Sequence, residues 1–189
     1  MFLKRIALIF IFGLYLSVFQ AFSQSERVRV IKFEDLQKQI NKVSDTTLVV
    51  HFWATWCKPC IEELPNYEKL SQEFIKKKIR FMLVSMDFPK DLKDKVEPFI
   101  AKNNINSEVV LLNEPDYNAW IDEIDKDWSG TIPATLIVNL TMRKRIFFEG
   151  QAKMEKFMEE LKEMTPVVGA NSNSPEASVA LTPRWGIVI

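Results

Sequence analysis

The chain has 189 residues, a length that suits one globular domain with its own hydrophobic core. Lysine and arginine total 25, and so do aspartate and glutamate, so the formal net charge at pH 7 is zero. This balance argues against a nucleic-acid-binding protein, which needs a basic surface, and against an acidic solvating tail.

A targeting segment is predicted over residues 1–23. Lys4 and Arg5 precede an apolar stretch from Ile6 to Phe19, and Ala21-Phe22-Ser23 has the small-x-small pattern of a cleavage site. The apolar stretch is shorter than the ~20 residues of a membrane-spanning helix. A longer window over the same segment reaches that length, so an uncleaved N-terminal membrane anchor is the alternative. In either case we expect the protein to be exported to the periplasm or another extracytoplasmic compartment.

The folded domain is predicted to span residues 24–165. It begins with a short edge strand around Val28–Ile31, and a helix follows over Glu34–Val43, where apolar residues recur at helical spacing. After a turn at Asp45-Thr46, the run Leu48–Ala54 shows little polar alternation. Such a run is typical of a strand that is buried on both faces.

Two cysteines, Cys57 and Cys60, follow this strand in C-x-x-C spacing. After them the hydrophobic period changes from that of a strand to that of an amphipathic helix. The apolar positions of this helix are Ile61, Leu64, Tyr67, Leu70 and Phe74. Pro59 falls in the first helical turn, where its missing N–H is not needed. The cysteines are therefore predicted to lie where a strand gives way to a helix.

This position has a chemical consequence for Cys57. A helix N-terminus carries partial positive charge and unpaired N–H groups, which stabilise a thiolate. The pKa of such a cysteine falls below the free value of about 8.5. We therefore expect Cys57 to be the nucleophile and Cys60, one turn further along, to be the resolving thiol. A purely structural disulfide is less favoured, because a bridge between neighbouring turns constrains the unfolded chain very little.

The rest of the domain alternates between strand and helix patterns. A helix between two strands predicts a parallel βαβ unit with a right-handed crossover. The expected elements are a strand at Ile79–Met86, a helix at Lys90–Lys102 interrupted by Pro98, a strand at Val109–Leu112, a helix at Tyr117–Ile124, a strand at Thr135–Leu140, an antiparallel partner at Arg145–Glu149 and a helix at Lys153–Met164.

Two motifs resemble a known family. W-A-T-W-C-K-P-C at Trp53–Cys60 closely resembles the active site of thioredoxin-fold thiol-disulfide oxidoreductases, and G-T-I-P-A-T-L-I-V-N at Gly130–Asn139 resembles their cis-proline loop and following strand. C-x-x-E-x-P at Cys60–Pro65 resembles the TlpA/ResA-like extracytoplasmic branch, which is related to the AhpC/TSA redoxins. The resemblance covers about residues 30–165, and the two motifs together are specific where C-x-x-C alone would not be.

The resemblance implies a thioredoxin fold of the α/β class, in which helices sandwich a central mixed β-sheet. It implies catalysis by Cys57 and Cys60 beside a cis bond before Pro133, without a cofactor or metal. Protein disulfides or dithiols are the implied substrates, and a membrane electron donor is the implied partner. Cytochrome c maturation and cysteine repair are the implied roles. The residues expected to contact the substrate surround the cysteines: Trp56, Lys58, Pro59, Thr131 and Ile132.

Two further residues are candidates for proton transfer. His51 occupies a position that resembles the buried acid of thioredoxins, so a neutral imidazole there could accept a proton from Cys60. Alternatively, His51 is a core residue bonded to a backbone carbonyl. Glu63, one helical turn after Cys60, matches a glutamate that tunes the cysteines in the TlpA/ResA-like branch. Burial would raise the pKa of its carboxyl and fit it for proton transfer.

Two other functions are kept open. A C-x-x-C pair can bind Cu(I), although the expected proline loop offers no histidine or methionine as a further ligand. A thiol peroxidase on the same fold carries a threonine three residues before its cysteine, whereas Thr55 lies two residues before Cys57.

Two features are left with open interpretations. Trp128 either lines the substrate groove or is a core aromatic residue. Residues 166–189 are rich in serine, asparagine, proline and alanine, and they are predicted to form a flexible C-terminal tail.

Overall fold

A computed structural model describes residues 27–42 and 45–165. The predicted targeting segment, residues 1–23, and the predicted tail, residues 166–189, lie outside the described residues. Among the described residues, no helix combines the length and the apolar character needed to cross a bilayer.

A six-stranded sheet forms the centre of the described structure, in the spatial order β1-β4-β3-β2-β5-β6. β1, β4, β3 and β2 run parallel, whereas β5 is antiparallel to both of its neighbours, β2 and β6. The strands are β1 (Arg29–Ile31), β2 (Thr47–Trp53), β3 (Ile79–Ser85), β4 (Glu108–Leu112), β5 (Ala134–Asn139) and β6 (Lys144–Glu149).

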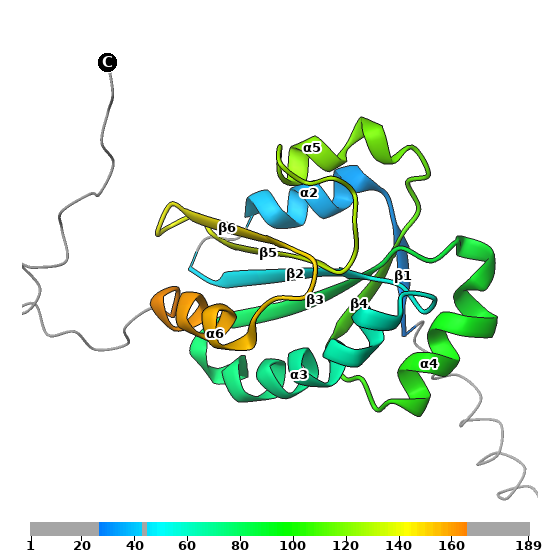
Figure 1. Cartoon of the computed structure of the whole chain (residues 1–189), viewed down its shortest axis with the longest axis horizontal. Coiled ribbons are helices and arrows are strands. Elements are labelled where there is room, and N and C mark those ends of the chain that lie inside the picture. The colour runs from blue at the N-terminus through cyan, green and yellow to red at the C-terminus, as the bar shows by residue number, and fades with distance from the viewer. Residues whose placement is uncertain (1–26, 43–44, 166–189) are drawn as a thin grey trace, which may run out of the picture.

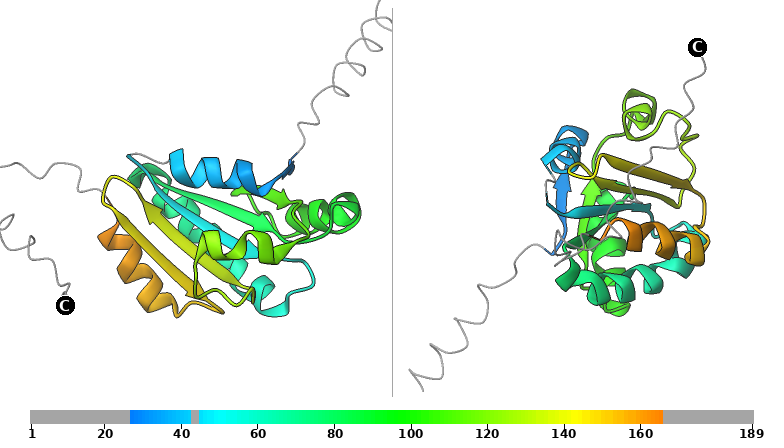
Figure 2. Two further views of the ribbon diagram at one scale, coloured as in Figure 1. Left: turned by 90° about the horizontal axis from the view of Figure 1, so that it is seen from above. Right: turned by 90° about the vertical axis from the view of Figure 1, so that its left-hand side faces the viewer.

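Helices cover both faces of this sheet (Figures 1 and 2). They are α2 (Phe33–Lys42), α3 (Lys58–Phe74), α4 (Glu97–Lys102), α5 (Ile121–Ile124) and α6 (Met154–Glu163). Figure 1 shows α2 and α5 on one face and α3 and α6 on the other. Aromatic contacts link the segments within each helical layer: the ring centroids of Phe33 and Trp120 are 5.3 Å apart, and so are those of Tyr67 and Phe157. The predicted fold class, a mixed sheet sandwiched by helices, is confirmed.

The strand before the cysteines is central to the core. All seven residues of β2 are buried, and β2 pairs with β3 on one side and β5 on the other. A strand surrounded in this way loses its polar alternation, as the sequence pattern predicted. Because β2 is held on both sides, the chain that leaves it at Trp53 starts from a fixed position, and α3 begins five residues later.

The prediction of one continuous helix over Lys90–Lys102 was wrong. The structure instead has a 3₁₀ turn at Pro89–Asp91, a π-helical turn at Leu92–Val96 and α4 from Glu97 onward. Pro98 lies in the first turn of α4 and not within a longer α-helix. Since proline lacks an N–H, it is tolerated at the start of an α-helix, and the irregular turns precede it.

The prediction of one continuous helix over Tyr117–Ile124 was also wrong. A 3₁₀ turn at Tyr117–Ala119 is separated from the short α5 by Trp120, whose φ of −143° is not helical. Trp120 is buried, with its ring 6.1 Å from Phe52 and 5.7 Å from Trp128. Burial of this large ring outweighs the local helical preference.

A buried carboxylate anchors α3 to the loop before β4. Glu68 accepts hydrogen bonds from the backbone N–H groups of Asn106 and Ser107, each at 3.0 Å, and from the Ser107 hydroxyl at 2.7 Å. Burial alone would raise the pKa of this carboxyl, but the hydrogen bonds from Ser107, Gln72 and Asn106 outweigh it and lower the pKa. The ionised carboxylate therefore fixes α3 to the rest of the domain.

Candidate active site

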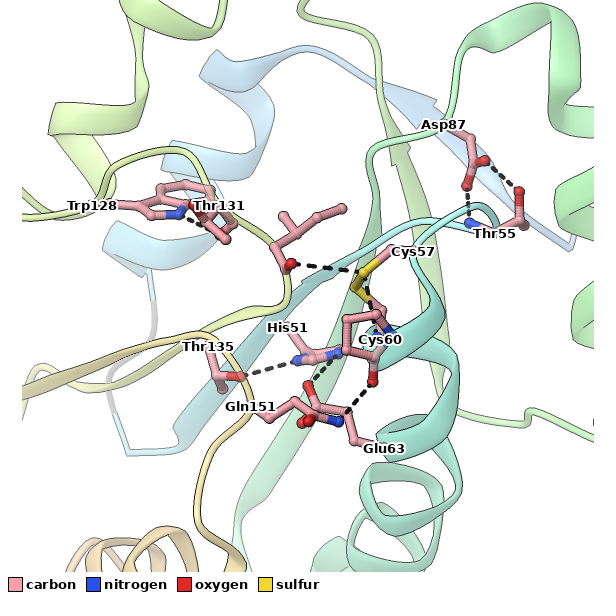
Figure 3. Close-up of a disulfide and its surroundings, with 12 residues drawn as sticks. His51, Thr55, Cys57, Cys60, Glu63, Asp87, Trp128, Thr131, Thr135 and Gln151 are labelled. Atoms are coloured by element: carbon pink, nitrogen blue, oxygen red, sulfur yellow. Dashed lines mark hydrogen bonds and ion pairs between the residues drawn. A yellow bond between two sulfur atoms is a disulfide. The ribbon is translucent and has the colours of Figure 1, made fainter.

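The two cysteines lie at the start of α3, after the end of β2, and they form a disulfide (Figure 3). Cys57 is the N-cap residue of α3, and its sulfur accepts a hydrogen bond from the Cys60 backbone N–H at 3.3 Å. Cys57 retains 5% of its accessible surface, whereas Cys60 retains none. Cys57 is therefore the more accessible of the two cysteines, and the N–H bond and helix N-terminus would stabilise its sulfur as a thiolate.

A side-chain clamp fixes the loop that carries Cys57. The Thr55 backbone N–H and hydroxyl donate to the two oxygens of Asp87, at 3.0 and 2.6 Å, and the Ser85 hydroxyl donates to the same carboxylate at 2.8 Å. Asp87 follows β3, which is the parallel neighbour of β2. The clamp therefore ties together the carboxyl ends of two central strands directly beside the disulfide (Figure 3).

The proline loop approaches the disulfide from the opposite side. The Ile132–Pro133 peptide bond is cis, and the Ile132 carbonyl oxygen lies 3.7 Å from Cys57 Sγ. Trp128 is buried, and its indole N–H donates to the Thr131 carbonyl at 2.9 Å. Of the two interpretations of Trp128, the structure favours a core aromatic residue, and this residue also holds the proline loop in place.

The residues expected to contact a substrate lie in the C-x-x-C motif or on the proline loop. Trp56 is 62% exposed, and Lys58, Pro59 and Thr131 are exposed as well, whereas Ile132 is half-buried. Lys58 pairs with Glu62 at 3.9 Å, but both side chains are solvated, so this pair contributes little. Three of the five residues, Trp56, Lys58 and Pro59, adjoin Cys57 in the motif, and Ile132 reaches it through its carbonyl, whereas Thr131 lies one residue further back beside Trp128. Trp56 is the one large apolar side chain among the five that faces solvent.

His51 and Glu63 lie beneath Cys60 and face each other (Figure 3). The His51 Nε2 atom is 3.5 Å from Glu63 Oε1, and both side chains are buried. Burial lowers the pKa of His51 from its usual 6.5 to about 3, so the imidazole is neutral at physiological pH. Burial also raises the pKa of Glu63 from 4.5 to about 7, so this carboxyl titrates near neutrality.

Two hydroxyl groups complete the surroundings of His51. Thr135 is paired directly opposite His51 across β2 and β5, and its Oγ1 lies 3.0 Å from His51 Nδ1. The same Oγ1 lies 2.8 Å from the Tyr67 hydroxyl, and the Tyr67 ring stacks on the imidazole at a centroid distance of 4.0 Å. The partner of the Nδ1 atom is thus a threonine hydroxyl and not the backbone carbonyl considered from the sequence.

No candidate metal centre accompanies the disulfide. Within residues 27–42 and 45–165, no group of three histidine, cysteine or acidic side chains is arranged to hold a metal ion. The two sulfurs are bonded to each other in this oxidised form.

The sequence profile of the AhpC/TSA family matches residues 27–143. The chain belongs to the AhpC/TSA family. The matched residues carry β1 to β5, the C-x-x-C motif and the proline loop, which are the elements that build the site described above.

Similar proteins carry the names expected from the motifs. The sporulation thiol-disulfide oxidoreductase A of Bacillus subtilis (strain 168) is 26% identical over 113 residues, which cover 59% of this chain and 62% of that protein. The thiol-disulfide oxidoreductase ResA of Geobacillus thermodenitrificans (strain NG80-2) is 22% identical over 136 residues, covering 70% of this chain and 72% of that protein. The predicted resemblance to the ResA-like oxidoreductases is therefore confirmed.

A solved structure supports the fold of this AhpC/TSA member. The thioredoxin-related protein from Neisseria meningitidis serogroup B superposes with a TM-score of 0.55, at 17% identity, over 66% of this chain and 88% of that one. At this identity the likeness bears on the fold alone, and the predicted thioredoxin fold is confirmed.

Several residues of the site were not singled out in the sequence. Asp87 had one signal, its place at the carboxyl end of a parallel strand, where functional residues of such sheets gather. Tyr67 lies on the same stripe of α3 as Cys60 and Glu63, but its apolar ring favoured a core interpretation. Gln151 donates from Nε2 to the Pro59 carbonyl at 3.1 Å, a contact between segments far apart in the sequence that no local pattern predicts.

Proposed function

We propose that this protein is a thiol-disulfide oxidoreductase that reduces disulfides in protein substrates through the Cys57–Cys60 pair. The observation that carries the proposal is the disulfide at the N-terminus of α3, with Cys57 Sγ 3.7 Å from the Ile132 carbonyl of the proline loop. A nucleophilic sulfur needs a stabilised anionic form, access to substrate and a second thiol within reach, and this arrangement supplies all three.

The reaction has two exchange steps. The Cys57 thiolate attacks one sulfur of the substrate disulfide, forms a mixed disulfide and expels the other substrate sulfur as a thiolate. Cys60 then loses its proton and attacks Cys57 Sγ, which releases the second substrate thiolate and forms the Cys57–Cys60 disulfide. Two electrons pass from the enzyme dithiol to the substrate. A thiol or other electron donor must then reduce the enzyme again.

Glu63 is proposed as the base for the second step. Cys60 is fully buried, so its thiol must lose a proton in a poorly solvated place, where burial raises the pKa of a thiol. Glu63 lies one turn along the same helix, and the pKa of about 7 lets its carboxylate take up a proton and release it near neutral pH. His51 borders Glu63 on the side of β2.

The substrate is proposed to lie along the proline loop. Main-chain groups of Thr131 and Ile132 would pair with an extended substrate segment, while the exposed ring of Trp56 covers its apolar side chains. This mode suits many substrate proteins, because main-chain pairing does not depend on the substrate sequence.

The cellular role is proposed from the N-terminal segment of the sequence. Its basic start, apolar stretch and cleavage pattern support export, which places the disulfide in an extracytoplasmic compartment. Reduction in such a compartment requires electrons from across the membrane, so a membrane electron donor is proposed. The ResA-like resemblance makes cytochrome c maturation or cysteine repair the proposed processes.

The reduction potential of the cysteine pair tests this proposal. The protein is equilibrated with reduced and oxidised glutathione, and the thiol content is followed by alkylation and mass spectrometry. A reductase should show one two-electron transition nearer to about −270 mV than to the about −120 mV of a strong oxidant. Cys57→Ser and Cys60→Ser should each abolish the transition. An oxidant-like potential would contradict the reducing direction, and a pair that does not exchange with glutathione would contradict the activity.

A further inference from the structure

A buried chain of polar groups runs from α3 across β5 to β2 and back to α3. Its members are Tyr67, Thr135, His51 and Glu63, and the contacts between neighbours measure 2.8, 3.0 and 3.5 Å. Tyr67 and Glu63 lie one helical turn apart on α3, while Thr135 and His51 are cross-strand partners. All four side chains are buried, so each of their O–H and N–H hydrogens needs an acceptor among these four residues.

The direction of the hydrogen bonds follows from the number of hydrogens available. Among the described residues, Thr135 Oγ1 is the one hydrogen-bond partner of the Tyr67 hydroxyl, so the Tyr67 hydrogen is satisfied only if it points to Thr135. Thr135 has a single hydrogen of its own, which is then directed to His51 Nδ1. The reverse direction would leave the Tyr67 hydrogen buried without an acceptor.

The other end of the imidazole completes the argument. If Nδ1 accepts a hydrogen bond, the neutral ring carries its hydrogen on Nε2. Nε2 and Glu63 Oε1 are both buried without another hydrogen-bond partner among the described residues, and they face each other at 3.5 Å. A small rotation of the carboxyl group brings this contact to hydrogen-bond length, with Nε2–H as the donor.

We infer that the Tyr67 and Thr135 hydroxyls hold His51 as its neutral Nε2–H tautomer, and that His51 is thereby a fixed hydrogen-bond donor to the Glu63 carboxylate. Tyr67, Thr135 and His51 are positioning residues in this arrangement. Neither ring nitrogen keeps a free lone pair, so His51 cannot serve as a base. Glu63 is then the group that exchanges a proton with Cys60, through the oxygen that His51 does not engage.

The titratable groups around this chain are few. Cys60 and Tyr67 face the site from α3, and His51 faces it from β2, whereas β5 contributes Thr135 and α6 contributes the Phe157 ring, neither of which titrates at these pH values. Burial, the charge of Glu63 and the Thr135 hydrogen bond act on the pKa of Tyr67, and the net effect raises it, so the phenol stays protonated. In the oxidised form, where Cys60 is held in the disulfide, a proton that enters the site near neutral pH therefore goes to Glu63.

The inference deepens the proposed function, because it assigns the proton acceptor of the resolving step, but its test does not depend on activity. The chain contains a single histidine, so ¹⁵N labelling of histidine reports one imidazole without ambiguity. The two ring nitrogens have distinct ¹⁵N shifts when they are protonated and unprotonated. The spectra are recorded between pH 5 and pH 9 on the oxidised protein and on the protein reduced with a phosphine.

The wild-type protein should show the Nε2–H tautomer throughout this range. An orphaned buried hydrogen should disfavour the reverse arrangement about tenfold or more, so this tautomer should exceed about 90% of the population. Glu63→Gln should keep the same tautomer, because the hydroxyl pair, and not the carboxylate, sets it. An Nδ1–H tautomer, an averaged signal or an imidazolium in this range would overturn the inference.

Substitutions at Thr135 separate the hydroxyl from its side-chain shape. Thr135→Val removes the donor to Nδ1, so the Nδ1–H form should become populated as Glu63 takes up its proton near pH 7. Thr135→Ser keeps the hydroxyl and should restore the wild-type spectrum. If Thr135→Val matches the wild type at every pH, the hydroxyl pair does not set the tautomer and the inference fails. If Thr135→Val does not fold, the wild-type, Glu63→Gln and Thr135→Ser spectra still decide the question. Loss of disulfide exchange with an intact Nε2–H signal would count against the proposed function alone.

Discussion

Replacing Glu63 by glutamine should make the protein relatively more stable at high pH. Burial raises the pKa of this carboxyl from 4.5 to about 7, so the folded state favours the protonated form. Below about pH 4.5 the carboxyl is protonated in both the folded and the unfolded chain, so its ionisation does not reduce the free energy of unfolding. Between about pH 4.5 and 7 the unfolded chain loses this proton while the folded state keeps it, so the stabilisation falls across this range and is lost above pH 7. A shift of this size corresponds to about 3 kcal/mol of unfolding free energy, at 1.36 kcal/mol for each pKa unit.

The assay is equilibrium unfolding in urea of the oxidised protein, with and without the Glu63→Gln substitution, at several pH values between 4 and 9. The free energy of unfolding of the variant minus that of the wild type should rise by about 3 kcal/mol across this range, with most of the change between pH 5 and 7. The difference between the two proteins removes the contribution of His51, which is present in both. Any constant cost of burying the amide adds equally at every pH.

Glu62→Gln is the matched control, since Glu62 lies next to Glu63 on α3 but is exposed. Its substitution should shift stability by a small amount that is the same at all pH values. If Glu63→Gln also gives a difference that does not vary with pH, the carboxyl is not buried in a way that raises its pKa, and the proposed base for Cys60 loses its support.

Three other substitutions give distinct results. Glu68→Gln should destabilise the protein by about 1–3 kcal/mol at pH 7, because the ionised carboxylate accepts hydrogen bonds from residues 106–107, and urea unfolding should show the difference shrinking as acid protonates Glu68. Exposed Glu73→Gln is its control, and an equal effect from both would contradict the anchoring role. Trp56→Ala and Phe88→Ala each remove an exposed ring, 62% and 56% accessible: Trp56 precedes Cys57, and Phe88 follows Asp87, which bonds to Thr55. Each variant should raise KM for a disulfide-containing protein by roughly tenfold and should raise KM for a small-molecule disulfide by less. If a variant raises KM equally for the protein and the small-molecule substrate, protein substrates do not dock on that ring.

The parts of the site that lie close together in sequence could be predicted from the sequence. Cys57 and Cys60 follow a strand whose unbroken apolar run shows that it is buried, and the change of period after them marks the helix. Local chemistry then gives the N-cap position of Cys57. The resemblance supplied the proline loop, which approaches the cysteines from a segment more than seventy residues away, with Ile132 O against Cys57 Sγ.

The remaining parts could not be predicted, because they depend on the register of strands and on packing. Thr135 meets His51 only because β5 pairs with β2 in one register, and a shift by one residue would turn its hydroxyl to the other face. The break at Trp120 arises because a large ring fills the space between two layers, which no helical period reports. Likewise, Asp87 reaches Thr55 through the order of parallel strands, and sequence spacing contains no information on that order.

Trapping of mixed disulfides tests the central claim most directly. Reduced Cys60→Ser and Cys57→Ser proteins are each mixed with a protein that contains one defined disulfide, and the covalent adducts are quantified by mass spectrometry after acid quenching. Cys57 caps α3 and retains 5% of its accessible surface, whereas Cys60 is fully buried. If Cys57 attacks and Cys60 resolves, as proposed, Cys60→Ser should accumulate an adduct through Cys57, whereas Cys57→Ser should form little. Equal adducts from both variants, or a larger adduct through Cys60, would contradict the assigned roles of the two cysteines.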